Sequence, residues 1–186
     1  MLSDSQILEA LKTGELKFEP SDISACLNPA GYDLRIAKTV IVKPKHYELV
    51  ATLETVELGL NVVATLHIRS SLAREGLIGS FAVVDPGFRG QLTLNLHNVG
   101  EKEVTLKEGE RIVQIMFHQL GSSAKKGYSG SYQDSKGIVK SRRNNECSRP
   151  ANYQNGFRLK RFCLLVLYSV HFSRISLYER DSRLLE

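Results

Sequence analysis

The sequence predicts an all-β sandwich or barrel preceded by short helices. Short runs rich in β-branched residues recur between Tyr32 and Leu120, and turn residues separate them. In one run, 91–97, leucines occupy every second position and polar residues the positions between, which is typical of a half-buried strand. Strands this short and closely spaced favour a sandwich or barrel over parallel βαβ units.

Seven segments carry the strand pattern, and Asp-Pro-Gly at 85–87 and Lys-Glu-Gly at 107–109 are turn signals between them. The expected strands are 33–43, 47–58, 61–70, 81–85, 91–99, 103–109 and 111–120. The interruption SSLAREGLIG, at 70–79, is expected to form a single turn or a short helix because it is rich in Leu and Ala.

The N-terminal segment predicts a short helix over residues 3–13. Ser3 and Gln6 have capping-box spacing ahead of an apolar run, and Gly14 is expected to end the helix. Ser21 and Asp22 form a second candidate helix start.

The chain is expected to divide at about residue 143. Residues 1–143 form the predicted β-barrel domain, which ends in a mobile arm, 121–143, rich in Gly, Ser and Lys. Residues 144–186 lack both alternation and turn-delimited strands. We interpret them as an extension of unknown structure, either non-native or disordered, with a hydrophobic helix over 159–168 as an alternative.

Composition and the number of cysteines indicate which kinds of support the fold needs. The chain has 186 residues, 42% of them hydrophobic, so it can bury a core without metal or disulfide support. Cys26, Cys147 and Cys163 are an odd number with no CxxC pair, which indicates neither a disulfide framework nor a zinc site.

Charge and hydropathy argue against nucleic acid and membrane partners. The net charge is +5, but +3 of it falls in 144–186, and no basic stripe interleaved with aromatics appears in the remainder. The longest apolar run, 162–170, is half of what a membrane span needs, and the N-terminus lacks a secretory pattern. We therefore expect a cytoplasmic protein.

Five segments carry the functional signal. They are NPAGYDLRI (28–36), IRSSLAREG (68–76), VVDPGFRGQLTLNLHN (83–98), EGERIVQIMF (108–117) and the looser KKGYSGSYQDSKG (125–137). In order and spacing they resemble the superfamily of trimeric deoxyuridine triphosphatases (dUTPases) and deoxycytidine triphosphate (dCTP) deaminases. The resemblance covers about residues 1–143. It implies a distorted, jelly-roll-like β-barrel and a homotrimer with shared active sites.

The second segment is a candidate phosphate site. Ser70 and Ser71 lie between Arg69 and Arg74, beside an expected helix start. Backbone N–H groups at a helix start and guanidinium forks both favour phosphate oxygens, although an ordinary capped turn is the alternative. The resemblance implies that this segment binds the triphosphate.

Asp85 is the candidate catalytic residue. A carboxylate at the end of an apolar run can hold and deprotonate a water, whereas an Asp that only starts a turn is the alternative. The resemblance favours catalysis, since the matching Asp of dUTPases activates the water that attacks the α-phosphorus. It also implies that Phe88 packs against the deoxyribose, and that hairpin arms at 81–85 and 91–96 read the base.

Four further residues are candidate substrate contacts. Gln114 interrupts an apolar strand, so it is either an outward-facing residue or, as the resemblance implies, a donor to a phosphate oxygen. Tyr128, Tyr132 and Gln133 lie in the arm, which the resemblance implies folds over the nucleotide.

Magnesium is the implied cofactor. The substrate phosphates would supply most of its ligands, so no residue is expected to bind the metal directly. Asp33 either holds a metal-bound water or braces Arg35, and we favour the structural role.

The choice between the two reactions depends on Asn95. The deaminase branch carries a proton-shuttling Glu ten residues after the matching Asp, and here that place holds Asn95, which cannot accept a proton near neutral pH. We therefore expect Asn95 to bind substrate, and the chain to be a dUTP diphosphatase that converts dUTP to dUMP and diphosphate. Two alternatives stay open. One is a mono- or bifunctional dCTP deaminase, and the other is a non-catalytic nucleotide-binding regulator.

Overall fold

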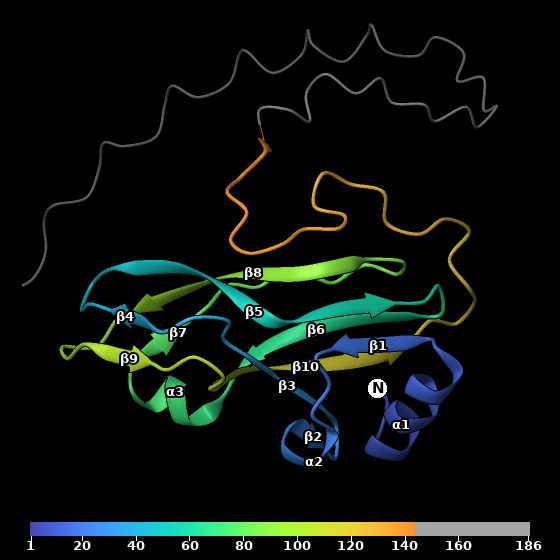
Figure 1. The fold of residues 1–186 in the computed structure, drawn as a ribbon, viewed down its shortest axis with the longest axis horizontal. Coiled ribbons are helices and arrows are strands. Elements are labelled where there is room, and N and C mark those ends of the chain that lie inside the picture. Colours follow the sequence, from blue (N-terminus) through green and yellow to red (C-terminus); the bar gives the residue numbers. More distant parts are fainter. Residues whose placement is uncertain (144–186) are drawn as a thin grey trace, which may run out of the picture. The chain divides into compact units, whose positions relative to one another are not determined.

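Two four-stranded antiparallel sheets and a two-stranded ribbon form the body of residues 1–143, which are the residues that this computed structural model describes (Figure 1). The all-β, jelly-roll-like prediction is confirmed. The extension over 144–186 and the helix expected at 159–168 lie outside the described residues, so the predicted division of the chain stays a prediction.

The first sheet has the strand order β1-β5-β8-β7. Its long pair, β5 with β8, breaks register once: Ala51 pairs with Thr93, but Thr55 pairs with Gln91. Three residues of β5 therefore stand opposite one residue of β8, as in a β-bulge. The strands are β1 (Leu16–Glu19), β5 (Tyr47–Leu58), β7 (Leu77–Ile78) and β8 (Arg89–Asn98).

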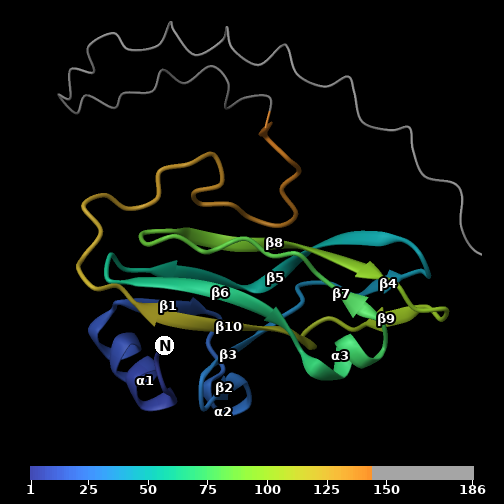
Figure 2. The same cartoon turned by 180° about the vertical axis from the view of Figure 1, so that it is seen from behind.

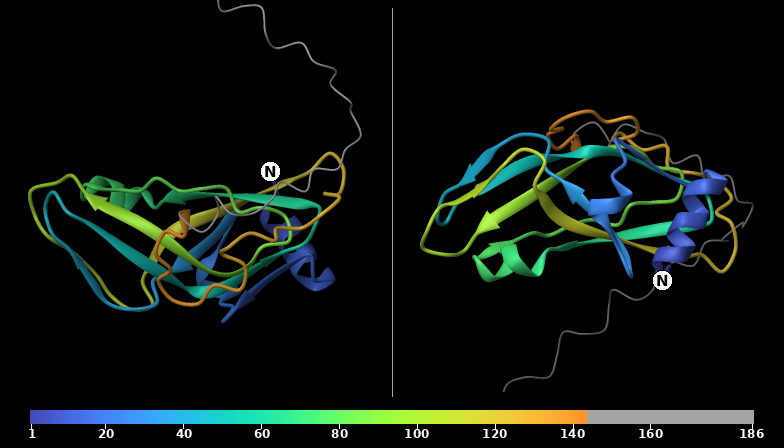
Figure 3. Two further views of the ribbon diagram at one scale, coloured as in Figure 1. Left: turned by 90° about the horizontal axis from the view of Figure 1, so that it is seen from above. Right: turned by 60° about the horizontal axis from the view of Figure 1, so that its bottom comes forward.

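The second sheet has the order β2-β3-β10-β6, and β4 and β9 pair separately as a ribbon. Figure 3 shows this ribbon at the end of the strands opposite α1. The strands are β2 (Leu27–Asn28), β3 (Gly31–Arg35), β4 (Val40–Val42), β6 (Val62–Ile68), β9 (Val104–Leu106) and β10 (Arg111–Gln119).

The helix predicted over residues 3–13 forms, and short helices also form at the second candidate start and within the interruption at 70–79. In α1 (Asp4–Thr13), Ser3 and Gln6 make the capping box, and Gly14 ends the helix with φ 78° in the left-handed region. The second helix, α2 (Ile23–Cys26), starts at Asp22, and the third, α3 (Ser70–Arg74), fills the interruption between strands. None of the helices among residues 1–143 is long and apolar enough to cross a membrane, and the cytoplasmic location stays a prediction.

Side chains of both sheets form one buried cluster. The rings of Phe18 and Tyr32 stack with centroids 4.2 Å apart, and Phe117 lies 6.0 Å from Phe18. The alternation expected in β8 holds, because Leu94 and Leu96 are buried in this cluster. Each such side chain stabilises the fold by about 1.5–3 kcal/mol relative to exposure.

The expected strand at 81–85 is wrong. Val84 instead forms an isolated bridge with Ala64 of β6, exchanging backbone hydrogen bonds of 2.8 and 3.0 Å. These bonds tie the segment to the second sheet, so it does not pair with β8 as a hairpin arm. The main partner of β8 is β5.

Candidate functional site

A cavity of about 880 Å³ lies beside β8, between residues 80–85 and the arm. This volume is within the ~300–1,000 Å³ range of small-molecule sites. Figure 2 shows the arm running beside β8 as a long connection without strands. Five of the predicted site residues line the cavity: Asp85, Phe88, Asn95, Tyr128 and Tyr132.

An aromatic pair forms one wall. Phe88 is buried, and its ring meets the edge of Tyr128 at a centroid distance of 5.6 Å. The backbone makes this approach feasible, because Gly87 has φ 78° and a Cβ there would lie 2.6 Å from the Cα of Gly127. The N–H of Tyr128 also donates to the carbonyl of Pro86 at 2.7 Å. The arm is thereby held against the turn that follows Asp85.

Asp85 and Asn95 are two of the polar side chains that line the cavity. Asp85 carries the one carboxylate among the described residues that line it. The Asn95 side chain accepts a hydrogen bond from the N–H of Ser80 at 3.4 Å. Sequence reasoning missed Lys140, an exposed arm residue that also lines the cavity. The basic run at 140–143 was the signal that could have indicated it.

Gln133 holds the arm without lining the cavity. Its side chain accepts from the N–H of Arg89 at 3.0 Å and donates to the carbonyl of Gly87 at 2.9 Å. Next to it, Arg89 and Asp134 form an exposed ion pair of 2.5 Å. The Arg89 hydrogen bond lowers the pKa of Asp134. In this structure Gln133 therefore contacts the turn at residues 87–89 of its own chain.

The predicted phosphate residues lie elsewhere. Arg69, Ser70, Ser71, Arg74 and Gln114 are absent from the cavity lining. Arg69 immediately precedes α3 and makes no side-chain cap, and Gln114 lies in β10 opposite Asp33 and His67. A single chain therefore does not bring these five residues together with Asp85.

Asp33 contacts one member of this second group, Arg69. Its buried carboxylate forms ion pairs with Arg69 at 3.2 Å and with Arg111 at 3.6 Å. Burial raises the pKa of Asp33, and the two guanidiniums act in the opposite direction. The preferred structural role fits these contacts, but Asp33 braces Arg69 and Arg111 rather than Arg35.

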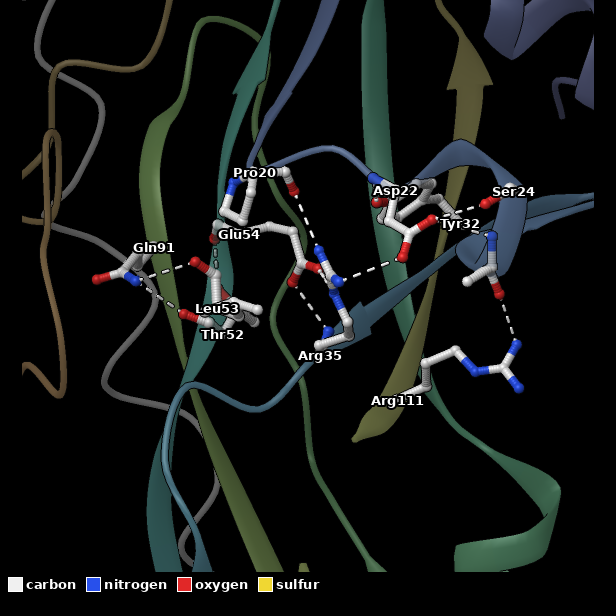
Figure 4. A network of polar contacts seen from close by, with 11 residues as sticks. Pro20, Asp22, Ser24, Tyr32, Arg35, Thr52, Leu53, Glu54, Gln91 and Arg111 are labelled. Atoms are coloured by element: carbon white, nitrogen blue, oxygen red, sulfur yellow. Dashed lines mark hydrogen bonds and ion pairs between the residues drawn. The ribbon is translucent and has the colours of Figure 1, made fainter. Parts of the chain in front are cut away.

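Arg35 instead pairs with Glu54, which sequence reasoning missed. Glu54 is fully buried and accepts from the Arg35 Nε at 2.6 Å and from its backbone N–H at 2.8 Å (Figure 4). This side-chain hydrogen bond raises the pKa of Arg35. The signal was available, since two-residue alternation in β5 places Glu54 on the same face as the buried Val56 and Leu58.

Residues 1–143 contain no group of three or more His, Cys, Asp or Glu that could hold a metal ion. A nucleotide-bound magnesium ion is compatible with that side-chain set, because phosphate oxygens can supply most of its ligands.

Comparison with known proteins decides the family. The model of the dCTP deaminase-like family matches residues 36–120. The dCTP deaminase of Pyrococcus abyssi is 49% identical over 132 residues, covering 63% of this chain and 86% of that protein. The dCTP deaminase of Thermococcus gammatolerans is 46% identical over 144 residues, covering 69% and 91%. The chain belongs to the dUTPase/dCTP deaminase superfamily.

Solved structures of the superfamily share the fold. The 2'-deoxycytidine 5'-triphosphate deaminase of Agrobacterium tumefaciens has a TM-score of 0.57 at 18% identity, covering 64% of this chain and 48% of that one. The EIAV dUTPase has a TM-score of 0.50 at 19% identity, covering 62% and 98%.

The dUTP diphosphatase prediction is wrong. Six relatives that are 42–49% identical are named dCTP deaminases, whereas the dUTPases are structural neighbours whose identities of 18–20% show the fold alone. The prediction failed because it gave one substituted position, Asn95, more weight than the whole body of the domain. The enzyme prediction is confirmed at the coarser level of this superfamily of nucleotide enzymes.

Proposed function

We propose that the chain deaminates dCTP, converting dCTP and water to dUTP and ammonia. The observation that carries the proposal is 49% identity to a dCTP deaminase, with 86% of that protein covered. A further relative, from Aquifex aeolicus, is named dCTP deaminase, dUMP-forming, and is 34% identical over 170 residues, covering 76% of this chain and 94% of that protein.

The cavity has the chemistry that a deoxycytidine needs. Phe88 and Tyr128 offer an apolar wall for the sugar and base. The side-chain amide of Asn95 both donates and accepts hydrogen bonds, so it can pair with the polar edge of cytosine. We assign base recognition to Asn95 on this ground.

Deamination also needs a proton carrier. Water attacks C4 of cytosine, a base takes one of its protons, and a proton must reach the amino group before ammonia leaves. Asn95 cannot carry that proton near neutral pH. Asp85 is the one carboxylate among the described residues lining the cavity, so we assign both proton transfers to Asp85.

The triphosphate would be bound by a neighbouring copy. Arg69, Ser70, Ser71, Arg74 and Gln114 do not line the cavity, and Figure 1 places α3 on the far side of β5 and β8 from the arm. We propose a homotrimer in which this group, with Arg69 paired to Asp33, completes the site of the adjacent chain.

Magnesium would enter as part of the substrate. Residues 1–143 hold no cluster of three potential ligands, and the triphosphate chelates Mg²⁺ by itself. The proposed substrate is therefore the magnesium complex of dCTP, with the basic residues of the neighbouring copy contacting the remaining phosphate charge.

Product analysis tests the proposal. Purified protein is incubated with dCTP and with dUTP, with and without magnesium, and ammonia and nucleotides are quantified. The proposal predicts ammonia and dUTP from dCTP, and no reaction with dUTP. Ammonia together with dUMP would assign the chain to the reaction named for the Aquifex relative, and no ammonia from dCTP would refute the proposal.

A further inference from the structure

Gln91 of β8 contacts two segments that are remote in sequence. Its side-chain NH₂ group donates to the carbonyl of Thr52 at 2.9 Å and to that of Leu53 at 3.3 Å. Its side-chain oxygen accepts from the N–H of Gly137 at 2.6 Å. One amide thereby joins the bulge of β5 to the arm.

The bulge side of this contact belongs to a buried network, which Figure 4 shows. Thr52 accepts from the N–H of Leu92 at 2.9 Å and donates to the carbonyl of Glu54 at 2.8 Å, and Glu54 holds Arg35. Thr52 and Glu54 are fully buried. The carbonyls that Gln91 contacts therefore lie in a part of β5 whose position is set by several hydrogen bonds.

On the arm side, residues 135–139 cross β8 and are hydrogen-bonded to it; we call this segment the strap. The N–H of Gln91 donates to the carbonyl of Ser135 at 2.9 Å, and the Ser135 hydroxyl donates to the carbonyl of Gln91 at 2.8 Å. Two residues on, Thr93 accepts from the N–H of Val139 at 2.9 Å and donates to the carbonyl of Gly137 at 3.3 Å. Gln91, Thr93, Ser135 and Val139 all line the cavity.

We propose that Gln91 is a positioning residue that fixes the arm in its closed position over the cavity, using the rigid bulge of β5 as its anchor. Gly137 has φ 64°, in the left-handed region, and its backbone N–H donates to Gln91 while its carbonyl accepts from Thr93. The closed arm brings Tyr128, Tyr132 and Lys140 to the cavity. The role in catalysis rests on the proposed dCTP deamination, but the role in arm closure does not.

Gln91→Met tests the proposal, because methionine has similar length and makes none of the three side-chain hydrogen bonds. Amide hydrogen exchange of Gly137 and Val139, measured without nucleotide, should become about tenfold faster. Gln119→Met, at the exposed end of β10, is the matched control and should leave this exchange unchanged. Ser135→Ala removes the hydroxyl that donates to the carbonyl of Gln91 and leaves the Gln91 contacts with the bulge in place. This variant should also speed amide exchange at Gly137 and Val139.

Kinetics separate positioning from general destabilisation. If the open arm must close before dCTP binds productively, Gln91→Met should raise KM about tenfold and leave kcat within about twofold. A merely structural role would instead lower kcat and the melting temperature without a change in KM. Unchanged exchange at Gly137 in folded Gln91→Met would overturn the proposal whether or not dCTP is the substrate. Faster exchange in a protein that releases no ammonia would support arm closure and refute only the proposed reaction.

Discussion

Asp85 and Asn95 line one cavity, although a turn and most of β8 separate them in the chain. The carboxylate can carry a proton and the amide can recognise a base edge, so the proposed deamination assigns proton transfer to Asp85 and base recognition to Asn95. This division explains how a site with Asn95 retains an acid–base group.

Asn95→Glu should increase deamination. A carboxylate at this position adds a second proton carrier beside the base, and general acid–base groups typically contribute ~10²–10⁴-fold. We expect the rate of ammonia release from dCTP to rise about tenfold or more. Asn95→Gln, which changes length but adds no proton carrier, is the control. An equal rate in the Asn95→Glu and Asn95→Gln variants would show that proton transfer at this position does not limit the reaction.

Mixed trimers should recover activity if sites are shared. Asp85→Asn and Arg69→Ala each remove one half of the proposed site, so each pure variant should be inactive. Co-expressed chains should form some sites with an intact Asp85 from one copy and an intact Arg69 from another. The measurement is ammonia release by the purified mixture, with light scattering for the mass of the assembly. Inactive mixtures of trimeric chains would place both residues in the same chain's site.

Glu54→Gln should destabilise the fold. Arg35 would lose its buried carboxylate partner, and a broken buried pair costs about 3–5 kcal/mol. Urea unfolding followed by circular dichroism measures this loss of unfolding free energy. Glu57→Gln is the control, because it removes only the exposed partner of Lys17 and should cost under about 1 kcal/mol. Equal costs for the two substitutions would contradict the assigned role of Glu54.

Stability should fall in alkali through Tyr32. Burial raises the pKa of Tyr32 from 10.0 to about 12, so the unfolded chain loses this proton at lower pH than the folded one. The folded state then binds more protons between pH 10 and 12, and the unfolding free energy falls by about 2–3 kcal/mol over that window. Tyr32→Phe should remove this part of the pH dependence, at a cost of about 1 kcal/mol at neutral pH for the lost hydrogen bond to Asp22. If the unfolding free energy of Tyr32→Phe still fell as steeply between pH 10 and 12, the assignment of this pH dependence to Tyr32 would be contradicted.

Local features were predictable from sequence, whereas long-range pairing was not. The capping residues of α1 and the alternation of β8 depend on neighbours within a few positions, and both are as expected. The segment at 81–85 is apolar like a strand, but its partner, Ala64, is remote in sequence.

In the candidate site, too, the local arrangement was predictable from sequence and the long-range arrangement was not. Asp85, Phe88 and Asn95 all lie between residues 85 and 95, on one turn and the strand that follows it, so their shared cavity follows largely from local sequence. The separation of Arg69 from that cavity depends on how the two sheets pack, which residue types do not reveal. Glu54 was the exception, since alternation alone indicated its burial.

Asp85→Asn tests the central claim most directly. The variant keeps the size and hydrogen-bonding shape of the side chain and removes only the group that carries the proton. Ammonia release from dCTP should fall by about 10²-fold or more, while nucleotide binding, followed by titration of dCTP, should persist. Asp134→Asn, in the exposed ion pair of the arm, is the control and should retain activity within a few-fold. Undiminished ammonia release by the Asp85→Asn enzyme would contradict the account.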